Sequence, residues 1–183
     1  LQAMGIDAYP AAAYEVTHYA AAIKHAFRDE APEQFAQVSL AGRLMSYRDM
    51  GKASFAELQD SSGRIQIYVR KDDLAKDGDT SLYDKVWKKA MDIGDFIGIK
   101  GFVFRTKLGE ISVHVKELVV LGKSLRPLPI VKEADGEVYD AVTDPEFKYR
   151  QRYADLVINP SVKEVFLKRT KLMNALRNFL NER

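Results

Sequence analysis

The chain has 183 residues, of which 46% are hydrophobic and 30% are charged, and this balance excludes a collagen-like or wholly disordered protein. Cysteine is absent, which excludes disulfides, thiolate–metal sites and a cysteine nucleophile. The net charge is only +2, but residues 37–71 carry six basic and three acidic side chains, and residues 144–183 carry nine and five. These two locally basic segments favour a phosphate-rich partner, although the total charge does not.

No apolar run approaches the roughly 20 residues that a bilayer-spanning helix needs, so no membrane partner is expected. The first five residues lack the basic-then-apolar pattern of a secretory signal, and a reducing, cytoplasmic setting is therefore expected. His18 and His25 could share a helix face, but an amphipathic helix explains their spacing better than a metal site does. No bound metal is expected.

Residues 1–36 form an N-terminal extension with one expected helix. Apolar side chains recur at helical spacing from Tyr19 to Phe27. Thr17 is the expected N-cap, and Pro32 follows the expected end of the helix.

From Gln37 onward, apolar and polar residues alternate, which predicts strands. Asp60–Gly63 and Thr106–Gly109 are turn signals that join strands into hairpins. The expected strands lie in residues 37–45, 53–59, 64–70, 97–103 and 111–115, with a short helix in residues 81–90. Three strands, a helix and two further strands, all antiparallel, match the element order of an OB-fold barrel. The fold is therefore predicted to be mainly β, with the barrel in residues 37–122; a five-stranded barrel of another topology is the alternative.

Residues 123–143 combine proline, glycine and charges without a sustained period, and they are predicted to be a linker. Residues 144–183 are predicted to hold a short basic helix in Glu146–Asp155 and a long helix that begins at Asn159–Pro160. One face of the long helix is apolar and is expected to pack against another surface. Its periodicity continues to Arg183, which is expected of a chain truncated from a longer protein.

No nucleophile motif, phosphate-binding glycine loop or metal-ligand cluster occurs, so no catalytic residue is assigned. Chemistry is expected instead on the outer face of the barrel, where alternation places Phe55 and Glu57 beside Gln66. An exposed ring can stack on a base while a nearby amide reads its edge, and Arg48 and Lys52 would add phosphate and base contacts. The alternative is that Phe55 only covers the barrel beneath a flanking helix.

The run from Gly42 to Val69 resembles the anticodon-binding domain of class II lysyl-tRNA synthetases. Three further segments agree with that family in the same order: Lys107–Ser112, Leu125–Pro129 and Tyr149–Leu156. Aspartyl- and asparaginyl-tRNA synthetases share much of this framework, and they are the alternative. The sequences of Met50–Phe55 and Arg150–Tyr153 favour the lysyl-tRNA synthetases over these alternatives.

The resemblance implies a site residue by residue. Phe55 would stack on the middle uridine of the anticodon, Gln66 would hydrogen-bond the edge of that base, and Arg48 would support both base and backbone. Glu110 would contact an anticodon base, and Glu57 lies on the same face with no role assigned to it.

The resemblance also implies that the full-length enzyme ligates lysine to tRNA with ATP and magnesium, as a homodimer. Residues 144–183 would begin its class II catalytic domain, so this chain alone is expected to bind tRNA but to be inactive and to bind no cofactor. Two other classes stay open: a stand-alone OB-fold that binds single strands without sequence preference, and a structural interaction domain that uses the apolar C-terminal helix.

Overall fold

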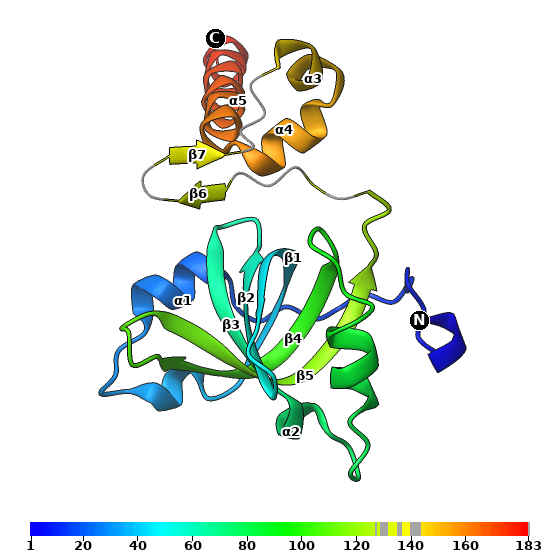
Figure 1. Cartoon of the computed structure of the whole chain (residues 1–183). Helices are drawn as coiled ribbons and strands as arrows, with labels where there is room; N and C mark the ends of the chain where they lie inside the picture. The colour runs from blue at the N-terminus through cyan, green and yellow to red at the C-terminus, as the bar shows by residue number, and fades with distance from the viewer. Residues whose placement is uncertain (127, 129–131, 135–136, 140–143, 183) are drawn as a thin grey trace. The chain divides into compact units, whose positions relative to one another are not determined.

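The computed structural model describes residues 1–126, 128, 132–134, 137–139 and 144–182, and the chain divides into two units, Leu1–Pro127 and Leu128–Arg183. The first unit is built around a closed barrel of five strands (Figure 1). They are β1 (Val38–Asp49), β2 (Ala53–Gln59), β3 (Arg64–Arg70), β4 (Phe96–Arg105) and β5 (Ile111–Gly122).

Around the barrel the strands follow the order β1–β2–β3–β5–β4, which confirms the predicted five-stranded OB-fold. Four neighbouring pairs are antiparallel, but β3 and β5 run parallel. The expectation that all strands are antiparallel is therefore wrong for this closing pair. Strand direction cannot alternate all the way around a ring of five, so one pair must be parallel.

Every second side chain of β2 and β3 points into the barrel and is buried, as their alternating sequences predict. The hydrophobic core also includes Ile23 of the N-terminal helix, Phe27 directly after that helix, and Tyr83 and Trp87 from the connection between β3 and β4. Within β2 and β3 the buried hydrophobic residues are Ala56, Leu58, Ile65, Ile67 and Val69.

The predicted N-terminal helix is present as α1 (Ala20–Ala26), but Thr17 is not its N-cap. The hydroxyl and backbone N–H of Thr17 instead bond to the backbone of Ser39 at the start of β1. The first turn of α1 is capped from the turn between β2 and β3. There, Oδ2 of Asp60 accepts from the N–H of Ala20 at 2.6 Å, and a serine hydroxyl accepts from the next N–H. This contact ties α1 to the β2–β3 hairpin.

The segment before α1 is extended and follows a short 3-10 turn, η1 (Gln2–Met4); a second such turn, η2 (Pro32–Phe35), precedes β1. Tyr14 lies against β4 at Gly98, where an added Cβ would approach the ring to 2.6 Å. Any larger residue at this position would displace the tyrosine. Glycine at position 98 therefore lets the N-terminal segment lie close to the barrel.

The connection from β3 to β4 contains α2 (Lys71–Leu74), which the sequence pattern missed, and η3 (Leu82–Trp87), which lies within the predicted helix. The backbone N–H of Lys88 bonds to the carbonyl of Tyr83, so η3 is wound with the wider i to i+5 pattern. Its aromatic residues, Tyr83 and Trp87, are buried in the hydrophobic core.

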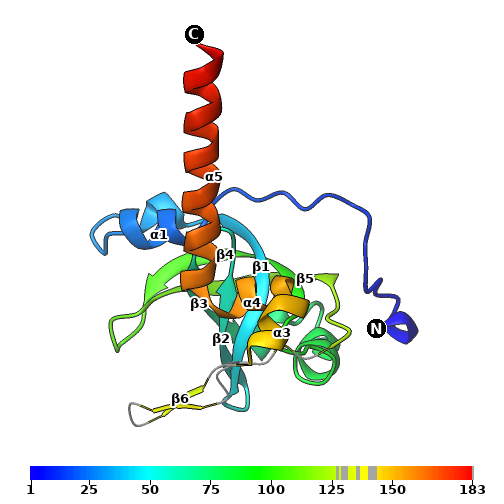
Figure 2. The same ribbon diagram turned by 90° about the horizontal axis from the view of Figure 1, so that it is seen from above.

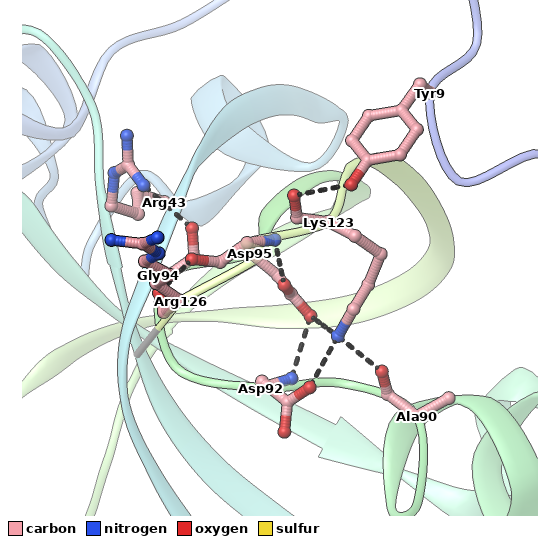
Figure 3. A network of polar contacts seen from close by, with 9 residues as sticks. Tyr9, Arg43, Ala90, Asp92, Gly94, Asp95, Lys123 and Arg126 are labelled. Carbon is pink, nitrogen blue, oxygen red and sulfur yellow. Dashed lines mark hydrogen bonds and ion pairs between the residues drawn. The ribbon is translucent and has the colours of Figure 1, made fainter. Parts of the chain in front are cut away.

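A buried carboxylate fixes the end of β5 (Figure 3). Asp95 accepts hydrogen bonds from Nζ of Lys123 at 2.6 Å and from the backbone N–H groups of Asp92 and Ser124 at 2.7 Å. Burial alone would lower the pKa of Lys123, but its hydrogen bonds to Asp92 and Asp95 raise that pKa above the ordinary lysine value. Tyr9 also donates to the carbonyl of Lys123, so this residue joins the N-terminal segment, β4 and β5.

In the second unit, two short strands, β6 (Lys132–Ala134) and β7 (Glu137–Tyr139), pair antiparallel within the segment predicted to be a linker. The predicted basic helix is divided into α3 (Pro145–Arg150) and α4 (Arg152–Ile158). Buried Asp155 pairs with Arg152 and accepts from the side-chain amide of Asn159. Asn159 is the N-cap residue of the next helix, as predicted, but its side chain makes no capping hydrogen bond.

The long helix α5 (Pro160–Asn181) is unbroken (Figure 2). Its described residues include no buried one, although the guanidinium of Arg152 lies 5.5 Å from the ring centre of Phe166. The apolar face of α5 is therefore left uncovered within the second unit, and its packing against another surface stays a prediction. No helix in the described part of the chain has the length and apolar character to cross a membrane.

Candidate functional site

Three adjacent strands place four of the predicted site residues on one outer face of the barrel. Phe55 on β2 is paired in register with Arg48 on β1 and with Tyr68 on β3. Two residues along, Glu57 is paired with Gln66. Because alternate residues of a strand share a face, these side chains form a continuous surface.

An open pocket of about 530 Å³ lies on this face. It brings together five of the six residues predicted from the sequence, and Lys52 does not line it. Lys52 is exposed on the turn between β1 and β2, where its backbone carbonyl accepts from Lys71. The lining residues are Ser46, Arg48, Phe55, Ala56, Glu57, Gln66, Leu108 and Glu110.

The aromatic part of the pocket is Phe55, which lies outside the hydrophobic core. Its ring is supported from one side by Tyr68, with ring centres 4.8 Å apart and planes inclined at 35°. Tyr68 in turn contacts His114 and Phe104. This packing limits how Phe55 can rotate, so its ring is positioned before any ligand arrives.

The two acidic side chains of the pocket both form ion pairs with basic side chains. Glu57 lies 3.2 Å from the guanidinium of Arg64, and Glu110 lies 3.0 Å from Nζ of Lys24. Among the described residues, the side chain of Arg48 has neither a hydrogen bond nor an ion pair, and it is exposed. The pocket therefore offers an unpaired cation to an anionic or polar ligand.

The turn between β1 and β2, next to Arg48, is held by contacts from η3 and from the residue that follows it. Nζ of Lys88 lies 2.9 Å from Asp49, and the hydroxyl of Tyr83 donates to the carbonyl of Gly51 at 3.1 Å. The hydrogen bond from Lys88 lowers the pKa of Asp49 below its ordinary value. Gly51 has a φ of 86°, which a residue with a side chain rarely adopts. The turn is thus fixed by the fold and by its glycine.

Besides Ser46 on β1, sequence reasoning missed three further contributors to this surface. Lys24 of α1 reaches Glu110, and Leu108 projects from the tip of the β4–β5 hairpin with 98% of its surface exposed. Ser112 on β5 donates a hydrogen bond to the side-chain carbonyl of Gln66 at 2.7 Å. Only the exposed leucine at a turn leaves a signal in the sequence. The other two contacts depend on the tertiary fold.

The site contains no triad and no metal cluster. In the described part of the chain, no three histidine, aspartate or glutamate side chains gather in a way that could hold an ion. A flat ring, an amide and a free guanidinium around an open pocket suit binding of a planar polar group joined to phosphate.

Comparison with known proteins identifies the barrel. Residues 38–121 match the tRNA anti-codon family model, which describes an OB-fold nucleic acid binding domain. The whole chain is 58% identical over 182 residues to the lysine–tRNA ligase of Porphyromonas gingivalis strain W83, of which it covers 32%.

Two further relatives agree. The chain is 56% identical over 183 residues to the lysine–tRNA ligase of Azobacteroides pseudotrichonymphae, covering 36% of it. Over 180 residues, or 98% of the chain, it is 54% identical to that of Christiangramia forsetii, covering 31%. The chain spans about a third of the length of these curated relatives. The resemblance seen in the sequence is confirmed: residues 38–121 match the tRNA anti-codon model of OB-fold nucleic acid binding domains, and the whole chain is similar to the corresponding third of lysine–tRNA ligases.

Proposed function

We propose that this chain is the anticodon-recognition module of a lysine–tRNA ligase, and that its pocket takes the middle uridine of the anticodon. The observation that carries the proposal is the pocket in which Phe55, Gln66 and Arg48 lie together on the outer face of the OB-fold barrel. Phe55 would stack on the base, Gln66 would hydrogen-bond its edge, and Arg48 would contact the base and its backbone.

The other predicted residues would serve the neighbouring nucleotides. Glu110, at the end of the β4–β5 hairpin, would contact an adjacent anticodon base, exchanging its ion pair with Lys24 for that contact. Glu57 borders the pocket but is held by Arg64. Lys52, on the turn beside the pocket, would contact phosphate.

In the full-length protein we assign lysine activation to the two thirds that this chain does not cover, with ATP and magnesium bound there. Residues 144–183 would lead into that catalytic domain, residues 1–36 would extend the barrel of residues 37–122, and residues 123–143 would connect the two. The complete enzyme is proposed to be a cytoplasmic homodimer.

The chain should bind an RNA stem-loop with a lysine-type anticodon and form no lysyl-adenylate. Fluorescence anisotropy with this stem-loop, with aspartate-type and asparagine-type loops, and with an unrelated single strand of equal length measures the first part. Equal affinity for all four RNAs would indicate a generic single-strand binder instead. Pyrophosphate exchange measures the second part, and lysine-dependent exchange at the rate of a complete synthetase would contradict it.

Arg48→Ala and Gln66→Ala should weaken binding in different ways. Arg48 carries an unpaired charge, so its removal should reduce the slope of log Kd against log salt concentration by about 1 or less, which corresponds to the release of one fewer counterion. Gln66 is neutral, so its removal should leave that slope unchanged and reduce the preference for uridine over cytidine at the middle base. Titrations between low and moderate salt measure both slopes. Identical slopes for wild type and both variants would show that Arg48 does not act through phosphate.

A further inference from the structure

A buried serine lies directly behind Gln66. Ser112 is fully buried on β5, and the parallel pairing of β3 with β5 places it in register with Gln66. Its hydroxyl donates to Oε1 of Gln66 at 2.7 Å, whereas the carbonyl oxygen of Glu110 lies 3.4 Å away. A hydroxyl has one hydrogen to donate. The hydroxyl hydrogen of Ser112 therefore goes to the nearer acceptor, Oε1 of Gln66.

This contact decides which end of the Gln66 amide remains for a ligand. A carboxamide can rotate by half a turn and exchange its oxygen, an acceptor, with its nitrogen, which carries two donors. With Oε1 bonded to Ser112, Nε2 is the end left over. Within the described residues Nε2 has no hydrogen-bonding partner, and Gln66 lines the pocket.

We propose that Ser112 is a positioning residue that makes Gln66 a donor, and so sets the chemical class of base that the pocket accepts. A donor favours a base with a keto oxygen at the facing position, such as O4 of uracil, and opposes an amino group, such as N4 of cytosine. This inference rests on the proposed function, and it adds a residue that does not itself touch RNA.

The first test compares two stem-loops that differ only in uridine or cytidine at the middle anticodon base. Wild type should bind the uridine loop about 3- to 10-fold more tightly, as one hydrogen bond supplies. In Ser112→Ala this ratio should fall to that of Gln66→Ala, and in Ser112→Thr, which keeps the hydroxyl, it should be restored. A merely structural role for Ser112 would weaken both complexes equally and leave the ratio unchanged, which would overturn the proposal.

The second test replaces the amide by a group that has no orientation to fix. In Gln66→Glu the carboxylate offers only acceptors, so the preference should invert in favour of cytidine. Adding Ser112→Ala to this variant should then leave the cytidine-to-uridine ratio unchanged within about twofold. A large further change in the double variant would mean that Ser112 acts by another route.

The third test needs no RNA, so it separates this proposal from the proposed function. Relaxation of the side-chain ¹⁵N of Gln66 in the free protein should report an ordered amide in wild type and Ser112→Thr and a mobile one in Ser112→Ala. Equal mobility in all three overturns the positioning role. If the amide behaves as expected but wild type does not distinguish a lysine-type loop from an unrelated strand, the proposed function fails and the ordering of Gln66 stands.

Discussion

Phe55→Ala should weaken binding of a lysine-type anticodon stem-loop by about 1–3 kcal/mol, which is the usual loss for a base that stacks on an aromatic ring. The barrel should remain folded, because Phe55 lies outside the hydrophobic core. Loss of the ring contact with Tyr68 should cost about 0.5–1.5 kcal/mol of stability, beyond the loss from the partly buried area of the side chain. Anisotropy titrations and thermal unfolding measure the two effects separately.

Phe96→Ala is the matched control for this variant. Phe96 is an exposed phenylalanine on β4 that does not line the pocket, so RNA affinity should not change when it is truncated. Phe55→Trp, which keeps a flat ring, should retain most of the affinity. Loss of folding in Phe55→Ala, or wild-type RNA affinity in that variant, would remove the basis for a stacking role.

Leu58→Ala should lower the free energy of unfolding by about 2–5 kcal/mol, the range for a leucine deleted from a packed core. Leu58 lies on the same strand as Phe55 but faces inward, with 1% of its surface exposed. It is paired with Leu44 on β1 and Ile65 on β3, which are also buried, so a cavity would open between three strands. Urea denaturation measures the loss.

Leu108 provides the matched leucine. Its side chain is 98% exposed at the tip of the β4–β5 hairpin, so Leu108→Ala should change stability by no more than about 0.5 kcal/mol. At a temperature where Leu58→Ala is still folded, the RNA affinity of the Leu58→Ala variant should equal that of wild type. An equal loss of stability in the two leucine variants would contradict the assignment of Leu58 to the buried, inward face of β2.

The β2–β3 hairpin could be predicted from the sequence down to its bounds. Alternation sets Ala53–Gln59 and Arg64–Arg70 as strands, and the Asp60–Gly63 turn joins them. The same alternation places Phe55 and Gln66 on a common face. Local pattern was sufficient here because both strands and their turn lie within one short stretch of chain.

Strand β1 shows where alternation fails. The pattern predicted an end near residue 45, but β1 continues to Asp49, and a bulge between Leu44 and Ser46 shifts its register against β2. Leu44 and Met45 are consequently both buried. A bulge inserts one residue and reverses the phase of the pattern. Counting alternate residues therefore could not find Ser46 on the lining of the pocket.

The contacts of Ser112 and Lys24 were beyond sequence reasoning for another reason. Ser112 meets Gln66 only because β3 and β5 are parallel, and an all-antiparallel prediction gives no such pair. Lys24 meets Glu110 through the placement of α1 beside the barrel. Both contacts join residues far apart in the chain, and single-sequence patterns carry no information about them.

The parallel closure of the barrel has a consequence for the order in which the protein is made. The β2–β3 hairpin holds Phe55 and Gln66 and can form locally, but the hydroxyl that orients Gln66 lies 46 residues further along the chain. Contacts at such separation form late, because the intervening loop must be closed first. A nascent chain that has emerged only through β3 would therefore present an aromatic ring and an unoriented amide. If the pocket binds the anticodon as proposed, the preference for uridine would be acquired only when β5 leaves the ribosome and closes the barrel.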